Sequence, residues 1–213
     1  VETIAAGEGN HILHRAVADL QGNLHVAYQS ARKDRSDIYV RSRSGGKWSG
    51  EINLSDPKRD ARANDWYPAI AADSDGTVWV AWDGYAGGNY NVYLRAVRKG
   101  RPGELLKVTD SPRFHAHPAV AVDARHRVWV AYDEAPENWG KDVGFLLSGG
   151  TGLYDSRTIK VAVYADGKWM TPLRQPGEVV PYGFRRGYPP PCGRRAASGR
   201  PSLLTTPATG GQN

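Results

Sequence analysis

Tyr67-Pro-Ala-Ile-Ala-Ala-Asp73 and Asp75-Gly-Thr-Val-Trp-Val-Ala-Trp82 form the stretch of sequence that decides the fold. The two apolar runs are rich in β-branched and aromatic residues and flank a polar Asp-Gly pair. That pattern is typical of two strands joined by a tight turn. Related stretches occur at His14–Tyr28 and His117–Tyr132. The repeat spacings are 54 and 50 residues, measured between Val26, Val80 and Val130.

Each repeat continues with two further candidate strands. The third alternates apolar and polar residues, which indicates one wetter face, and starts at Asp37, Asn91 and Thr158. The fourth follows a glycine-containing turn at residues 48–54, 104–108 and 169–173. Four antiparallel strands joined by short hairpins make a propeller blade. We therefore predict an all-β domain over residues 1–180, with blades at roughly 14–55, 67–110 and 117–175 and an extra N-terminal strand at residues 2–5.

The repeat resembles the blades of six-bladed propellers of the NHL and gluconolactonase-like groups, and more distantly those of sialidases. The sialidase Asp-box is not matched, because Ala72-Asp-Ser-Asp-Gly-Thr-Val-Trp79 lacks the Ser and Asp at the expected places. The resemblance covers residues 1–175, implies the fold and transfers no catalytic residue. Propellers typically have four to eight blades, so three would leave two open blade faces carrying Trp and Tyr. Either the chain is a fragment, or two copies form a homodimer that completes six blades, which we expect.

The last part of the chain has a different composition. Residues 182–213 hold five arginines and no acidic residue, so removing these charges from the net charge of +6 leaves +1 for residues 1–181. The repeats therefore show no basic stripe, and we expect no nucleic-acid partner. We read residues 181–213 as an irregular Pro/Gly/Arg-rich tail, either a natural linker or an out-of-frame translation.

Other sequence features say little about the cellular location of the protein. No run of about 18 apolar residues occurs, so we expect no membrane partner. Cys192 is the only cysteine, which excludes an intrachain disulfide. The chain opens without a signal segment, and a periplasmic or secreted bacterial parent remains compatible with the sequence.

The propeller geometry predicts where a functional site would form. The innermost strand is the first of each blade, and the loops entering it lie on the same face as the loops after the second strand. Our alignment places His14, Tyr67 and His117 at the start of the innermost strands, with Ile12, Asp65 and His115 two residues earlier. The second strands end at Gln29, Asp83 and Asp133. A long segment of the third repeat, residues 133–157, adds Glu134, Glu137, Trp139 and Asp142.

Three of these residues suggest a metal. His115 and His117 stand at i and i+2, so in a regular strand both imidazoles point to the same side. Together with His14 they predict a site for zinc, manganese or calcium, in which the ion could activate water. Asp65 or Asp133 would act as ligand or base. The first hypothesis is therefore a metal-assisted hydrolase of a small ester, phosphoester or lactone, although hydrogen-bonded surface histidines and turn-capping aspartates explain the same residues.

Two other function classes remain open, because a fold alone does not select a function. The second hypothesis is a propeller that binds carbohydrate or peptide without catalysis. Its aromatic rim would comprise Trp66, Tyr67, Tyr85, Tyr90 and Trp139, with Asp83 and Glu134 as polar binding groups. The third is a glycosidase or polysaccharide lyase, for which Asp65, Asp83 and Asp133 supply carboxylates. Nucleophilic Ser-His-Asp chemistry lacks support, because no Gly-x-Ser-x-Gly elbow is present.

Overall fold

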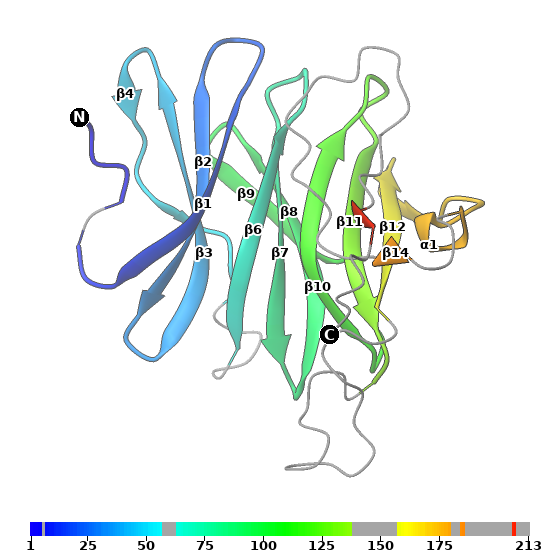
Figure 1. Cartoon of the computed structure of the whole chain (residues 1–213). Helices are drawn as coiled ribbons and strands as arrows, with labels where there is room; N and C mark the ends of the chain where they lie inside the picture. The colour runs from blue at the N-terminus through cyan, green and yellow to red at the C-terminus, as the bar shows by residue number, and fades with distance from the viewer. Residues whose placement is uncertain (6, 57–62, 138–156, 180–183, 186–205, 208–213) are drawn as a thin grey trace.

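The computed structural model describes residues 1–5, 7–56, 63–137, 157–179, 184–185 and 206–207 (Figure 1). Three antiparallel sheets stand side by side along the chain. Blade 1 contains β1 (Asn10–Ala18), β2 (Leu24–Arg32), β3 (Arg35–Ser44), β4 (Lys47–Trp48) and β5 (Ile52–Asn53). Blade 2 contains β6 (Asn64–Ala72), β7 (Val78–Ala86), β8 (Asn89–Arg98) and β9 (Arg101–Lys107). Blade 3 contains β10 (Phe114–Val122), β11 (Val128–Ala135), β12 (Thr158–Ala165) and β13 (Lys168–Met170), and is followed by α1 (Pro176–Val179).

The strand order confirms the predicted all-β propeller blades. Within each sheet the strands pair in chain order, and β4 and β5 both pair with β3 as two pieces of one outer strand. The first strands of the blades are neighbours, because β6 packs against both β1 and β10. This is the arrangement around a propeller axis. Each blade begins three or four residues before its predicted start, because the first strand continues through an irregular step.

That irregular step is a bulge that recurs in all three first strands. The pairing register shifts between residues 12 and 15, 66 and 69, and 116 and 119. At each shift one residue adopts a left-handed backbone, with φ of 52° at Leu13, 49° at Tyr67 and 51° at His117. These three positions are therefore equivalent, and the alignment of His14 with Tyr67 and His117 is wrong by one residue. The position two residues before the bulge is His11, not Ile12, in blade 1.

The turns at the opposite end of the blades follow the sequence prediction. Gly22 and Gly76 take φ of 80° and 81°, and His126 takes 61° at the equivalent place in blade 3. The Asp123 carboxylate accepts the backbone N–H groups of Arg125 and Arg127 at 2.9 and 3.1 Å. Burial raises its pKa, but hydrogen bonds from Trp129, Arg127 and the backbone outweigh burial and lower the pKa to about 2. The carboxylate therefore holds this turn closed over a wide pH range.

Apolar side chains fill the seams between blades. In the seam between blades 1 and 2, the fully buried Trp82 packs in one cluster with Ile38, Val40 and Leu54. The seam between blades 2 and 3 contains a second cluster built on Trp79, Leu94 and other residues of the two blades. Blade 2 thus buries one face of its sheet against blade 1 and the other face against blade 3.

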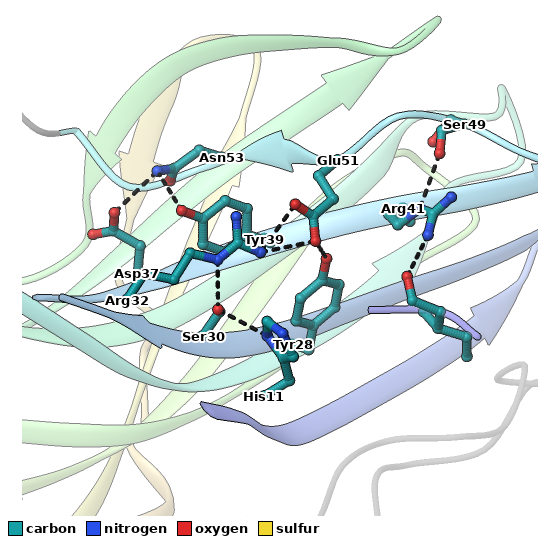
Figure 2. A network of polar contacts seen from close by, with 11 residues as sticks. His11, Tyr28, Ser30, Arg32, Asp37, Tyr39, Arg41, Ser49, Glu51 and Asn53 are labelled. Carbon is teal, nitrogen blue, oxygen red and sulfur yellow. Dashed lines mark hydrogen bonds and ion pairs between the residues drawn. The ribbon is translucent and has the colours of Figure 1, made fainter. Parts of the chain in front are cut away.

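The other face of blade 1 is covered by polar contacts (Figure 2). Tyr28 and Tyr39 stack there with ring centroids 6.0 Å apart. They occupy the positions that Trp82 and Tyr93 hold in blade 2. Arg32 lies 4.2 Å above the Tyr39 ring and donates two 2.9 Å hydrogen bonds to Glu51. The Tyr28 hydroxyl also donates to Glu51. Tyr28 is only 2% exposed and Tyr39 is partly buried. The sequence predicted an open blade face here, whereas contacts within the chain cover this aromatic pair.

The chain ends add smaller elements. Residues 2–5, expected as an extra outer strand, form no strand in the structure. Side chains of blade 1 hold them instead: Glu2 accepts from Arg43 and Trp48, and the Ile4 carbonyl accepts from Arg41. In the predicted irregular tail, the described pieces β14 (Phe184–Arg185) and β15 (Thr206–Pro207) pair with each other. No helix among the described residues has the length and apolar character to span a membrane. The six-bladed homodimer stays a prediction.

We expect Trp82→Ala to lower the free energy of unfolding by about 3–5 kcal/mol, because it removes a fully buried ring from the seam. Urea denaturation followed by circular dichroism measures the loss. The matched control is Trp169→Ala, on an outer strand with 36% of the residue exposed, for which we expect a loss of at most about 1 kcal/mol. Equal losses in the two variants would contradict a seam centred on Trp82.

Candidate functional site

Three buried carboxyl groups lie at the inner ends of blades 2 and 3. Asp65 is contributed by β6, Asp83 by β7 and Asp133 by β11. Their exposed fractions are 0%, 1% and 0%, so all three sites predicted from the sequence are beneath the surface. Buried carboxyl groups of this kind need charge or hydrogen-bond partners. The neighbouring residues supply both.

Asp83 joins the two blades at this point. Its Oδ1 accepts the backbone N–H of His117 at 3.1 Å, at the bulge of β10. Burial raises the pKa of the Asp83 carboxyl well above its usual range, the His117 amide opposes this, and the nearby Asp65 and Asp133 charges raise the pKa further. Burial thus favours the neutral acid form of Asp83 over its carboxylate.

His117 is paired with a carboxylate. Its Nδ1 lies 3.1 Å from Oδ2 of Asp133. Because an ionised carboxylate only accepts, the neutral imidazole tautomer that bonds to it carries its hydrogen on Nδ1 and leaves Nε2 unprotonated. Arg157 places Nη1 at 3.6 Å from the same Asp133 oxygen. The buried carboxylate therefore orients the imidazole while a guanidinium offsets its charge.

Tyr67 lies beside His117 across the seam between blades 2 and 3. Their ring centroids are 4.8 Å apart in an edge-to-face arrangement. Tyr67 is 42% exposed, whereas 15% of the His117 side chain is exposed. Both residues occupy the left-handed position of a bulge. A phenol ring and an imidazole ring from adjacent blades thus meet near the surface. Non-glycine residues in this backbone conformation cluster at functional sites.

His115 belongs to a separate polar group. Its Nε2 lies 3.4 Å from Oε2 of Glu134, whose other oxygen is 3.3 Å from Arg113 Nε and 4.0 Å from Lys160 Nζ. His115 is 2% exposed. Burial lowers its pKa, the Glu134 charge opposes this, and Arg113 adds to the lowering. His115 is therefore a neutral buried histidine, held by Glu134.

The expected convergence of three histidines on one ion is not found. His115 and His117 pair with Glu134 and Asp133, which are adjacent in β11 and so point to opposite faces of the sheet. The bulge at His117 breaks the i, i+2 alternation on which the expectation rested. His14 is exposed and lies one position past the bulge. Within the described part of the chain, no group of three or more His, Cys, Asp or Glu residues could hold a metal.

The remaining predicted residues divide into two groups. Trp66 lies on the same face of blade 2 as Asp83, its pairing partner in β7. It packs against Tyr90, with the two ring centroids 5.7 Å apart. Glu137 is exposed, and Trp139 and Asp142 lie outside the described residues. Arg157 was not among the site residues predicted from the sequence, although it directly precedes β12, the third strand of its blade. An alignment of the repeats based strictly on Val26, Val80 and Val130 would have made Leu13 the equivalent of Tyr67 and His117.

Comparisons with known proteins support the fold. No family model matches the chain, and no curated protein matches it in sequence. The structure is similar to polysaccharide lyase PL25-ulvanlyase bound to -[GlcA(1-4)Rha3S]-, with a TM-score of 0.56 and 14% identity, covering 82% of this chain and 44% of that one. It is also similar to polysaccharide lyase Uly1, with a TM-score of 0.52 and 8% identity, covering 77% and 41%. A Penicillium chrysogenum α-L-arabinanase complexed with arabinobiose matches at a TM-score of 0.47 and 11% identity, covering 77% and 51%.

The likeness to the two lyase structures shows the fold alone. The propeller resemblance is confirmed at that level, and the neighbours that support it include polysaccharide lyases. The assignment to NHL and gluconolactonase-like groups stays a prediction. The chain spans less than half the length of the two lyase structures.

We expect Asp83→Asn to change how stability depends on pH. Since the pKa of Asp83 is raised in the folded protein, the folded state holds its proton more tightly than the unfolded state does. The free energy of unfolding of the wild type therefore falls as pH rises above the unfolded carboxyl pKa of about 3.9. Asn cannot ionise and still accepts the His117 N–H, so the variant gains stability relative to the wild type between about pH 4 and about pH 8.

Urea denaturation at the two pH values measures this difference. Asp75→Asn is the control with the opposite sign. Burial raises the pKa of Asp75, but hydrogen bonds from Thr77 outweigh burial and lower it, so loss of that carboxylate costs more stability as pH rises. A difference between Asp83→Asn and the wild type that stays constant with pH would show that Asp83 ionises normally.

Proposed function

We propose that the chain carries the catalytic face of a polysaccharide lyase acting on a uronate-containing polysaccharide. The observation that carries this proposal is the pairing of His117 with buried Asp133 next to the exposed Tyr67. Support also comes from the fold likeness to a lyase bound to -[GlcA(1-4)Rha3S]-, which contains a uronate. A lyase needs one base and one acid close together, and these two side chains meet that need.

The reaction would be a β-elimination. His117 Nε2 takes the proton from C5 of the uronate, and the electron pair of that C–H bond forms the C4=C5 double bond. The bond from C4 to the bridging oxygen breaks, and Tyr67 gives its hydroxyl proton to the leaving oxygen. Water returns a proton to Tyr67, and the imidazolium releases its proton to solvent. Asp133 holds the imidazole in the required tautomer and balances the charge that forms on it.

The burial of the carboxyl groups favours elimination over glycoside hydrolysis. A glycosidase places two carboxyl groups on either side of the scissile bond. Asp65, Asp83 and Asp133 are at most 1% exposed, so a sugar could not lie between them without rearrangement. Tyr67 and His117, by contrast, reach the surface.

The metal-assisted ester hydrolase gains no support from the site. Its three histidines are dispersed, since His14 is exposed, His115 pairs with Glu134 and His117 pairs with Asp133. Asp65 and Asp133, expected as metal ligand or base, have other roles in this proposal. Asp133 acts through His117, and the charge of Asp65 helps to raise the pKa of the buried Asp83.

We expect His117→Ala to lower kcat by about 10²- to 10⁴-fold on a polysaccharide of the -[GlcA(1-4)Rha3S]- repeat, because general base catalysis typically supplies that much. Tyr67→Phe should have a similar effect while keeping the ring against His117. The ultraviolet absorbance of the unsaturated uronate measures the rate, and mass spectrometry identifies the new chain end.

The matched control is His126→Ala, at the opposite end of blade 3, which should keep full activity. Products that have gained a water molecule would identify hydrolysis and overturn the lyase. Unsaturated products made at the wild-type rate by His117→Ala would overturn the assignment of the base.

A further inference from the structure

A cluster of four aromatic rings adjoins the His117–Tyr67 pair. Tyr90 is its centre, with centroid distances of 5.7 Å to Trp66, 5.0 Å to Tyr85 and 5.1 Å to Phe114. Each of the four residues is partly exposed. The cluster therefore presents aromatic surface at the same seam as the pair, and Trp66 directly precedes Tyr67 in β6.

The seam between blades 1 and 2 shows how the same positions are filled when no aromatic cluster is present. The registers equate Tyr90 with Ser36 and Phe114 with Asn64. Ser36 N–H donates to Asn64 Oδ1 at 2.9 Å, and Ser36 Oγ–H donates to the Asp65 carbonyl at 3.0 Å. At these positions, two hydrogen bonds thus join blade 1 to blade 2. The propeller repeat itself does not require aromatic residues here.

The other two cluster positions show the same contrast. Trp66 is equivalent to Ile12 in blade 1 and to Ala116 in blade 3. Tyr85 is equivalent to Ala31 and Ala135. Only blade 2 has large aromatic rings at both sites, on the side of the seam where Tyr67 stands. Packing alone would be served by the smaller residues of the other blades.

The backbone around the cluster is fixed. Asn89, in the β7–β8 hairpin that carries Tyr85 and Tyr90, donates from Nδ2 to the carbonyls of Ser111 and Arg113 at 2.7 and 3.2 Å. These bonds tie the blade 2 hairpin to the segment leading into Phe114. The rings are therefore held in place before any ligand arrives, which reduces the entropy lost on binding.

We propose that Trp66, Tyr85, Tyr90 and Phe114 form a sugar-binding subsite that stacks a pyranose ring of the polysaccharide next to the cleavage point. Aromatic rings offer large, rigid apolar surfaces to the C–H faces of a sugar, while the tyrosine hydroxyls bond its oxygens. The identity of the sugar, a residue next to a uronate, rests on the proposed lyase function. The stacking itself requires only the cluster.

Trp66→Ile and Tyr85→Ala test the subsite, because they install the residues that blade 1 carries at the same positions. Binding of an oligosaccharide of the -[GlcA(1-4)Rha3S]- repeat is measured by calorimetry in the His117→Ala background, in which cleavage is slow. We expect each variant to weaken affinity by about 2- to 12-fold, the range of a single aromatic contact. In the active chain, the same changes should raise KM more than they lower kcat.

Trp169→Ile is the control, since it changes an exposed tryptophan on the outer strand of blade 3, and it should bind as the parent does. Thermal unfolding shows whether the variants stay folded. Unchanged affinity in both cluster variants, or no binding of the probe to the parent, overturns the subsite. Loss of affinity without unsaturated products from the wild type keeps the subsite and overturns the lyase, so the two failures are distinguishable.

Discussion

Packing between successive blades is the interaction on which the rest of the structure depends. A four-stranded sheet with apolar residues on both faces is unstable when those faces are exposed to water. Burial of Trp82 against Leu54 and Ile38 removes one of these faces from solvent. The same packing sets β1, β6 and β10 beside one another. Side chains far apart in sequence then meet at the inner edge, as where the His117 amide reaches Asp83.

The bulge in each first strand turns this framework into a site. A non-glycine residue in the left-handed region costs about 1–3 kcal/mol and persists only where surrounding structure holds it. At His117 the buried Asp83 carboxyl accepts the amide of the strained residue, and at Tyr67 the neighbouring ring of His117 packs against it. The strain breaks the regular alternation of side chains. As a result His117 turns to Asp133 while His115 pairs with Glu134.

The repeats share one backbone but carry different chemistry. The end of the second strand is Gln29 in blade 1, Asp83 in blade 2 and Asp133 in blade 3. Blade 1 is closed by hydrogen bonds at its seam and by the Arg32–Glu51 pair on its other face (Figure 2). Acid, imidazole, phenol and aromatic cluster gather at the seam of blades 2 and 3. Repetition thus supplies the geometry, and departures from the repeat supply the candidate function.

The sequence by itself determined the blades, the turns and part of the site. Strand periodicity and turn residues act locally, so the spacing of Val26, Val80 and Val130 was enough to define the repeat, and the propeller layout was enough to gather Asp65, Tyr67, Asp83, His117 and Asp133. Only the tertiary structure decided which of them interact. A bulge of one residue reverses the direction of every side chain beyond it. The two histidines that were expected to bind one metal ion therefore contact two different carboxylates. The burial that raises the pKa of Asp83 and the approach of Arg157 to Asp133 also depend on contacts between strands, which the order of residues does not contain.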